Sequence, residues 1–280
     1  MKNITITEPW IVEFKEEGVL RTGKICLLDA DFIKYIAESR AEKIITSEFI
    51  DDPEIIKQCY ITCALEICEE LVFGIRDPII FCFSGSSSKT FRHHIAIQKK
   101  YKGNRPEKER LVVECMNAIV ERILNNYVGL LFSDLEADDV LCMLQNEHTY
   151  IHSKDKDLKQ VPGWHYNRET HNLINISSTE AVHFLATQML TGDSTDAICG
   201  LEGCGPKKAE KILEGVSTNN LISCVYREYK KKYGIIKGTD LFTSNWQLIK
   251  MRENHGEYFK EKYAAAFTLL ETIQNKFINP

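Results

Sequence analysis

Short clusters of acidic residues are the feature of this 280-residue sequence that could do chemistry. Carboxylate oxygens are preferred ligands of hard divalent cations such as Mg²⁺. Two such ions about 4 Å apart can clamp the attacking and leaving oxygens of a phosphodiester. Several clusters brought into one pocket would therefore predict metal-assisted hydrolysis. The clusters lie at Asp29/Asp31, Glu136/Asp138/Asp139, Asp155/Asp157 and Asp193/Asp196.

Each cluster taken alone also fits a plainer structural role. Ser133 and Glu136 have the spacing of a capping box, with Ser133 as the N-cap and Glu136 at N3 of the following helix. Asp155 and Asp157 fit a solvated turn, and the 193–196 segment fits an Asx turn or a helix cap. Only the four clusters together favour a metal site, because crowded carboxylates repel one another unless cations neutralise them.

A basic segment separates the first two acidic clusters. Residues 89–110 contain eight Lys or Arg against two Glu, a charge of +6 in a chain whose net charge is −5. A solvated helix face is one explanation. Phe91 and Tyr101 lie within the segment and favour nucleic acid instead, because aromatic rings give bases a stacking platform. Such a segment predicts phosphate binding that weakens steeply as salt rises.

The elements that must position these residues alternate between strand and helix patterns, which predicts an α/β fold with a mostly parallel central sheet. Ligand sites in such sheets lie outside the carboxyl ends of the strands. Asp29 and the Asp155/Asp157 pair fall at such ends. The expected strands are 24–29, 78–83, 128–132 and 149–152, and the expected helices are 53–74, 111–125 and 136–146.

Composition indicates an ordinary folded chain, with 44% apolar and 27% charged residues. No apolar run reaches the ~20 residues of a membrane helix, and the first 17 residues lack a signal-peptide pattern, so we expect no membrane partner and a cytoplasmic location. The ten cysteines then lie in a reducing compartment and lack Cys-x-x-Cys spacing, which disfavours zinc. A change of pattern near residue 177 predicts two domains, 1–177 and 178–280.

The ordered set of motifs resembles the FEN/5′→3′ exonuclease superfamily, and phage 5′→3′ exonucleases most closely. The 5′-nuclease domain of bacterial DNA polymerase I belongs to the same superfamily. The resemblance implies a PIN-like nuclease domain with a helical arch, followed by a helical domain that carries a helix-hairpin-helix (H3TH) element. The motifs are Leu-Leu-Asp29-Ala-Asp31, Phe91-Arg92, Tyr101-Lys-Gly-Asn-Arg105, Glu136-Ala-Asp-Asp139, Ser153-Lys-Asp-Lys-Asp157, Gly192-Asp-Ser-Thr-Asp196 and Gly200-Leu-Glu-Gly-Cys-Gly-Pro206.

The resemblance also implies roles for individual residues. Two Mg²⁺ ions, which Mn²⁺ can replace, would be held by two sets of carboxylates. Lys102 and Arg105 would be the catalytic cations of the arch, at the scissile phosphate, and Tyr101 would stack on a base near the 5′ end. The first metal set would be Asp29, Glu136, Asp138 and Asp139, and the second Asp155, Asp157, Asp193 and Asp196.

The remaining implied contacts are with DNA. Lys89 and Arg92 would contact DNA phosphates. The turn at Gly203 and Gly205, with Lys207 and Lys208, would grip the duplex backbone, and a monovalent cation would bind at that turn. The implied substrate is duplex or flapped DNA, or an RNA/DNA hybrid, cleaved in replication, primer removal or recombination.

One position departs from the family pattern. Family members place an Asp just after the second strand, where this chain has Ser84. Asp31, Asp134 or a water bound by Ser84 could compensate. The departure leaves open a weak or inactive DNA-structure-binding protein on the same scaffold. A PIN-type ribonuclease is disfavoured, because the turn at 203–205 suits a duplex.

Overall fold

The computed structural model describes residues 22–85, 90–167, 171–252 and 257–277, and its centre is a six-stranded sheet. The strand order is β3-β2-β1-β4-β5-β6; the first five strands run parallel, and β6 pairs antiparallel with β5. The predicted parallel α/β sheet is confirmed. The strands are β1 (Ile25–Asp29), β2 (Ile79–Phe83), β3 (Gly129–Leu131), β4 (Thr149–His152), β5 (Gly163–Asn167) and β6 (Asn172–Ile176).

This strand order explains where a site can form. From β1 the chain adds β2 and β3 on one side, then crosses back to place β4 on the other side. The direction of winding therefore reverses next to β1. A crevice opens outside the carboxyl ends of strands at such a reversal, and ligands bind there. Asp29 ends β1, and Asp155 follows β4 by three residues.

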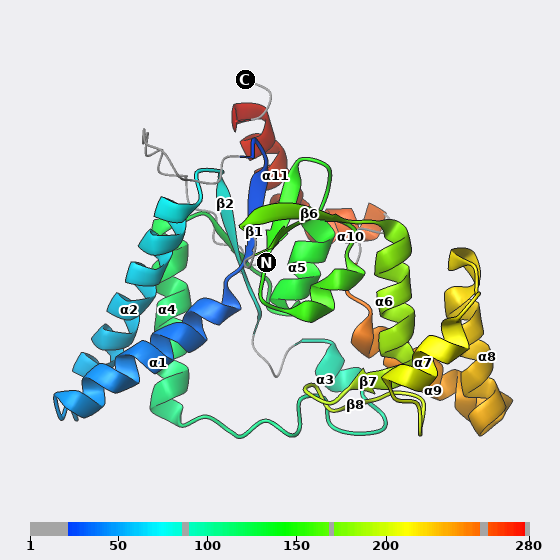
Figure 1. The fold of residues 1–280 in the computed structure, drawn as a ribbon. Helices are drawn as coiled ribbons and strands as arrows, with labels where there is room; N and C mark the ends of the chain where they lie inside the picture. Colours follow the sequence, from blue (N-terminus) through cyan, green and yellow to red (C-terminus); the bar gives the residue numbers. More distant parts are fainter. Residues whose placement is uncertain (1–21, 86–89, 168–170, 253–256, 278–280) are drawn as a thin grey trace.

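Helices cover both faces of the sheet, and the side chains of β1 alternate between them. Cys26 and Leu28 share a core with three helices that stand together on the left of Figure 1. Ile25 and Leu27 pack on the opposite face, in a core that includes side chains of α5 and α11. The first set is α1 (Asp31–Ser47), α2 (Pro53–Gly74) and α4 (Arg110–Asn126); the second is α5 (Ala137–Leu144) and α11 (Ala264–Phe277).

The second half of the chain builds a separate core beside the sheet. Leu185, Met189, Val225, Tyr229 and Leu248 are buried in it. Its helices form the right side of Figure 1. The elements are α6 (Ser178–Thr191), the hairpin β7 (Gly192–Asp193) and β8 (Ile198–Cys199), α7 (Pro206–Leu213), α8 (Leu221–Tyr233) and α9 (Ile235–Ile249), with 3-10 turns η1 (Lys156–Gln160) and η2 (Thr218–Asn220).

The C-terminal helices do not follow the expected domain division. We expected 178–280 to form one helical domain, but α10 (Glu257–Lys262) leads into α11, whose Leu269, Leu270 and Ile273 are buried with Ile25 and Ile80 of the sheet. Burial of apolar side chains decides this placement. The division at 177 is otherwise compatible with the start of α6, where Ser177 accepts a hydrogen bond from Glu180 N at 3.2 Å.

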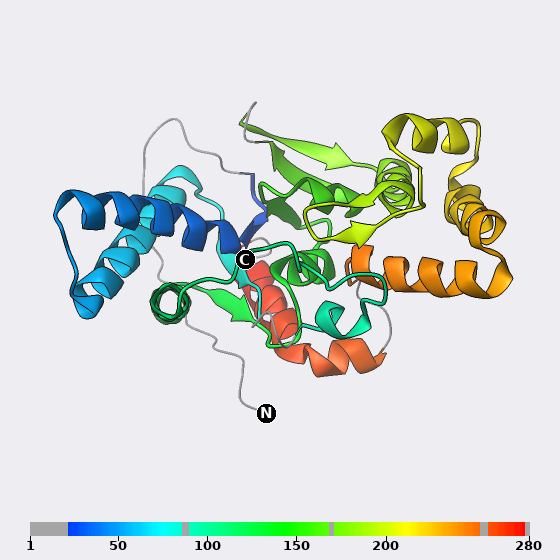
Figure 2. The same ribbon diagram turned by 90° about the horizontal axis from the view of Figure 1, so that it is seen from below.

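The segment expected to form a helical arch lies between β2 and α4. Its described part, residues 90–109, contains one short helix, α3 (Arg92–Ile95), followed by turns. Figures 1 and 2 show this segment passing beside the β7–β8 hairpin before it reaches α4. Over the described ranges, no helix has the length and apolar character needed to cross a bilayer.

Candidate active site

Asp29 lies at the carboxyl end of β1 and is 8% exposed. Its carboxylate accepts hydrogen bonds from Ser153 Oγ at 2.7 Å and from Asp31 N at 3.2 Å. Burial, followed by the negative charge of Asp31, raises the pKa of Asp29 above its usual range; Asp155 adds to the effect. The strand end therefore concentrates negative charge, as its position at the sheet edge predicted.

Ser84, which replaces the family carboxylate, has a structural role at the start of α5. Its hydroxyl accepts a hydrogen bond from Ala137 N at 2.9 Å, and its own N–H donates to Asp31 Oδ1 at 3.2 Å. Of the two acids that could compensate, Asp31 therefore lies beside Ser84. Asp134 instead binds Lys262 and Tyr263. The expected cap at Ser133 is wrong, because α5 begins four residues later, after Glu136.

We predict that Ser84→Ala lowers the free energy of unfolding by about 1 kcal/mol, because Ala137 N loses its acceptor at a helix start. Urea denaturation measures the change. The matched control is Ser133→Ala, since Ser133 accepts no α5 hydrogen bond in the described residues. Equal losses in the two variants would contradict the role of Ser84.

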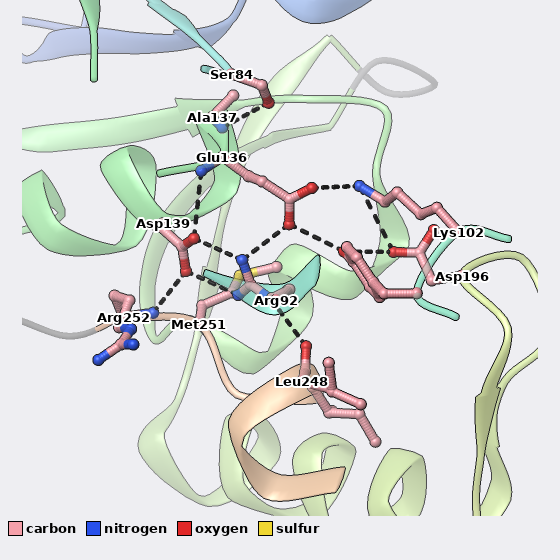
Figure 3. Close-up of polar contacts among 12 residues, drawn as sticks. Ser84, Arg92, Lys102, Glu136, Ala137, Asp139, Asp196, Leu248, Met251 and Arg252 are labelled. Carbon is pink, nitrogen blue, oxygen red and sulfur yellow. Dashed lines mark hydrogen bonds and ion pairs between the residues drawn. The ribbon is translucent and has the colours of Figure 1, made fainter. Parts of the chain in front are cut away.

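Arg92 is the centre of a buried ion-pair cluster rather than a surface cation. It is 3% exposed, and its guanidinium binds Glu136 Oε2 at 2.8 Å and both oxygens of Asp139 at 2.6 and 2.8 Å (Figure 3). Its Nε donates to Leu248 O of α9 at 2.9 Å. The cluster thus joins α3, α5 and α9.

Two predicted roles are wrong in this arrangement. Arg92 cannot contact DNA phosphate, because its guanidinium is buried and bound to Glu136, Asp139 and Leu248 O. Asp139 is fully buried, and both its oxygens accept from Arg92; Arg252 N and Glu136 N use the remaining capacity at 2.9 and 3.4 Å. Asp139 therefore positions Arg92 and offers no oxygen to a metal.

Tyr101 and Lys102 both approach the carboxylates of Glu136 and Asp196. The Tyr101 hydroxyl donates to Glu136 Oε2 and is equally close, 2.9 Å, to Asp196 Oδ2. The Lys102 ammonium binds Glu136 Oε1 at 2.5 Å and lies 3.8 Å from Asp196 (Figure 3). Arg105 binds Asp196 Oδ1 at 2.6 Å. The expected base stacking by Tyr101 is wrong here, since the ring is 3% exposed.

Asp155, Asp157 and Asp193 form the second acidic group. Asp155 Oδ1 accepts from Asp157 N at 2.7 Å, and Asp193 Oδ1 accepts from Thr195 N at 2.7 Å, the Asx turn that the spacing predicts. Burial, followed by a hydrogen bond with the Asp193 carboxyl, raises the pKa of Asp157. Two carboxyls that interact this closely need a proton or a bound cation to offset their charges.

Asp138 lies between the two acidic groups. Burial and then the charges of Asp29 and Asp155 raise its pKa well above the usual range. One cleft of about 120 Å³ is lined by Asp138 together with acidic and cationic side chains from distant segments. The structure thus brings together most of the predicted site: Lys102, Arg105, Glu136, Asp155, Asp157, Asp193 and Asp196 also line the cleft.

The acids are not assembled as a finished metal site. In the described ranges, no three His, Cys, Asp or Glu side chains are grouped to hold a metal ion. The contacts above give the reason: Arg92, Lys102 and Arg105 already neutralise Glu136, Asp139 and Asp196. The protein's own cations therefore relieve part of the repulsion that the sequence assigned to metal ions.

The other predicted DNA contacts, at the turn 203–205 and the start of α7, lie away from the cleft. Lys89 is outside the described residues. Gly203 and Gly205 precede α7, and Gly203 has a φ of +70°. Lys207 and Lys208 are exposed at the start of α7, and Lys208 Nζ donates to Gly203 O at 3.2 Å. This geometry leaves the turn accessible from solvent.

Two positions of the site were not found from the sequence. Ser153 links the two acidic groups, because its hydroxyl donates to Asp29 and accepts from Asp155 N at 2.9 Å. Gly85 allows the chain after β2 to approach the segment between β3 and α5, since a Cβ there would clash with Phe132 O. The spacing of Ser153 and Asp155 is typical of an ST turn, and this was the available signal for Ser153. For Gly85 the only signal was that the residue is a glycine.

Residues 56–185 match the family model described as 5′-3′ exonuclease, N-terminal resolvase-like domain. This match supports the resemblance of the chain to the FEN/5′→3′ exonuclease superfamily. A 5′-3′ exonuclease of Mycoplasmopsis pulmonis is 29% identical over 182 residues, covering 55% of this chain and 60% of that protein. Flap endonuclease Xni of Shewanella oneidensis is 26% identical over 171 residues, covering 54% and 64%. The matched part of the chain thus spans less than two thirds of the length of these relatives.

Solved structures extend the likeness to the whole fold. T5 5′-exonuclease with bound zinc superposes with a TM-score of 0.55 at 15% identity, covering 91% of this chain and 98% of that one. At this identity the match speaks for the fold alone. It agrees with a PIN-like sheet flanked by helical parts, including the second core that the family model does not reach.

Proposed function

We propose that the chain is a metal-dependent 5′ nuclease that hydrolyses DNA phosphodiester bonds at or near 5′ ends. The observation that carries the proposal is the meeting of four remote segments at one cleft: acids from α5, η1 and the β7–β8 turn face the cationic residues 102 and 105. The names of the relatives, 5′-3′ exonuclease and flap endonuclease, support the same reaction.

The donors of the second acidic group suit a hard divalent cation, which would have to draw the three carboxylates closer together. Asp157 Oδ1 is buried and has no hydrogen-bond partner in the described structure, and Asp193 and Asp155 supply further carboxylate oxygens beside it. All the donors are oxygen, which favours Mg²⁺ or Mn²⁺ over softer metals. T5 5′-exonuclease is known with divalent ions bound, which supports this assignment. We propose that Asp155, Asp157 and Asp193 hold one ion.

Asp29, Asp138 and Glu136 are the proposed ligands for a second ion. Burial and neighbouring carboxylates raise the pKa values of Asp29 and Asp138. A bound cation would offset the negative charge that these neighbours concentrate. Glu136 would join them once Lys102 leaves it. When bound, divalent ions lower the pKa of water and offset charge on the phosphate oxygens.

The chain's own residues would bind and orient the scissile phosphate. Lys102 and Arg105 lie at the mouth of the cleft, with side chains 21% and 46% exposed, so both can exchange a carboxylate for a phosphate. A phosphate held there would take over the positive charge that now neutralises Glu136 and Asp196. Arg92 stays in place and fixes Glu136 through its buried ion pair. Binding of substrate would thereby free the acids that hold metal.

The duplex beyond the cleft would be held without base readout. The exposed turn at 203–205 and the lysines at the start of α7 present N–H groups and positive charge, which bind phosphate irrespective of sequence. A monovalent cation at this turn is part of the same proposal. Duplex or flapped DNA is the proposed substrate, and primer removal or recombination in the cytoplasm the proposed setting.

The test is a duplex with a labelled 5′ overhang, incubated with the full chain in Mg²⁺, Mn²⁺ or EDTA. We expect metal-dependent shortening from the 5′ end and no cleavage in EDTA. An intact substrate that still shifts on a gel would support the binding-only alternative and overturn the nuclease. Cleavage that persists in EDTA would overturn the metal assignment while leaving hydrolysis intact.

A further inference from the structure

The α1–α2 turn presents an acidic and apolar surface far from the cleft. We define this acidic tip as residues 44–55. Phe49 there is 92% exposed, and Ile44 and Ile55 are 43% and 51% exposed. Phe49 also has a φ of +52°, a conformation that a bulky residue adopts at a cost. The tip carries Glu48, Asp51, Asp52 and Glu54 and no Lys or Arg.

The α8–α9 hairpin presents the opposite combination. A groove of about 250 Å³ runs between the two helices, lined by Ile222, Tyr226 and Phe242 together with Ser223, Thr239 and Thr243. Its Tyr226 and Thr239 hydroxyls are hydrogen bonded at 2.9 Å. We call this surface, with the hairpin turn at its end, the basic groove.

The turn of the hairpin extends the basic groove with charge and apolar area. Ile235 and Ile236 are 76% and 81% exposed, and Ile235 lies one helical turn before the groove residue Thr239. Residues 230–237 contain four lysines, of which Lys231 and Lys232 lie 3.9 and 3.6 Å from Glu228 and Glu202. Lys230 lies 4.2 Å from the centre of the Tyr226 ring, so positive charge borders the groove itself. The surface therefore suits an acidic segment with bulky apolar side chains.

The two surfaces cannot meet within one molecule. Figures 1 and 2 both place the α1–α2 turn and the α8–α9 hairpin at opposite ends of the protein. Contiguous exposed apolar groups of this kind mark sites of association. Their opposite charges would steer one end of a molecule toward the other end of a second molecule.

We propose that the acidic tip of one copy of this chain docks in the basic groove of a second copy, with Phe49 as the anchor. Such a contact is heterologous: each molecule keeps one free tip and one free groove, so copies add head to tail. Neither surface touches the cleft, so the contact leaves the proposed active site open. Successive copies would thus be held beside one another.

Sedimentation velocity of the full chain over a concentration series, in low and high salt, tests the contact. We expect the average sedimentation coefficient to rise with concentration and to fall with salt. Phe49→Ser, or Ile235→Ser with Ile236→Ser, should weaken association at least about tenfold, as loss of a central anchor does. Phe73→Ser is the control, because Phe73 is 74% exposed but lies at the other end of α2.

A mixing experiment separates this geometry from any other. The Phe49→Ser chain keeps a groove, and the double Ile→Ser chain keeps a tip, so an equimolar mixture should form a dimer that grows no further. Because all three side chains are exposed, each variant should keep the melting temperature of the wild type. A wild type that stays monomeric at every concentration would overturn the proposal, as would variants that associate alone.

Nucleic acid is the other possible occupant of the basic groove. If the groove binds DNA, the double Ile→Ser chain should lose affinity for a duplex while the Phe49→Ser chain does not, and the mixture should form no dimer. That result would overturn self-association. Loss of self-association in both chains, with unchanged duplex affinity, would support it.

Discussion

Asp155→Asn with Asp157→Asn should reduce cleavage by about 10³-fold or more while DNA affinity stays within a few-fold of wild type. The reason is that these carboxylates, with Asp193, are the proposed metal ligands, and amide oxygens hold a divalent cation far less strongly. Binding survives because the phosphate contacts come from Lys102, Arg105 and the exposed turn at 203–205. Single-turnover cleavage and gel-shift titration measure the two quantities.

The fold should tolerate this double change. An Asn at 155 keeps the oxygen that accepts from residue 157 N, and an Asn at 157 can donate to Asp193, which removes the need for a shared proton. The melting temperature should therefore be unchanged or higher. Glu42→Gln with Glu69→Gln is the matched control, because it removes the same charge from exposed positions on α1 and α2. Unaltered turnover in the Asp155/Asp157 variant would remove these residues from the mechanism.

The strands that the sequence predicted are those buried on both faces. The 79–83 run and its neighbours are continuous apolar stretches, as the interior of a parallel sheet requires. The strands β5 and β6 were missed because neither is a continuous apolar run: Gly163–Asn167 and Asn172–Ile176 mix polar and apolar residues and are only partly buried, and β6 forms the edge of the sheet. Pairing with β4 on one side and with β6 on the other makes β5 a strand.

Convergence of the acids was predictable from topology, but the identity of their partners was not. Asp29 and the Asp155/Asp157 pair lie at strand ends, which meet at one edge of any parallel sheet. Arg92, by contrast, belongs to a segment of charge +6 in which every cation looks alike. What separates Arg92 from Lys99 is burial against α5 and α9, and this depends on tertiary packing that no local pattern encodes.

The crowded carboxylates were assigned wholly to metal because the sequence does not show which cations of the chain are buried beside them. Three acids on one turn do require cations, and this inference holds. However, Arg92 supplies part of the positive charge from within the chain, and it does so at Asp139, the acid with no exposure. The sequence indicated that the negative charge of these acids must be balanced, but it did not indicate that Arg92 balances part of it.

Arg92→Met should lower the free energy of unfolding by about 3–5 kcal/mol, the cost of breaking a buried ion pair by removing one partner. Met fills similar volume, so the loss comes from Asp139 and Glu136, 0% and 7% exposed, which would keep buried charges without a guanidinium. Urea denaturation measures it. Arg110→Met is the control: that side chain is 93% exposed, and its ion pair with Glu114 should contribute nothing measurable.

Adding Asp139→Asn to Arg92→Met should restore much of the lost stability, because the uncompensated charge is its cause; a double-mutant cycle gives the coupling. This result would separate an internal clamp from a DNA contact. If Arg92 bound phosphate, Arg92→Lys would keep its stability and change the salt dependence of DNA binding. If it clamps α3 to α5 and α9, Arg92→Lys should lose stability, since one ammonium cannot replace the bidentate contact with Asp139. Salt dependence should then match the wild type.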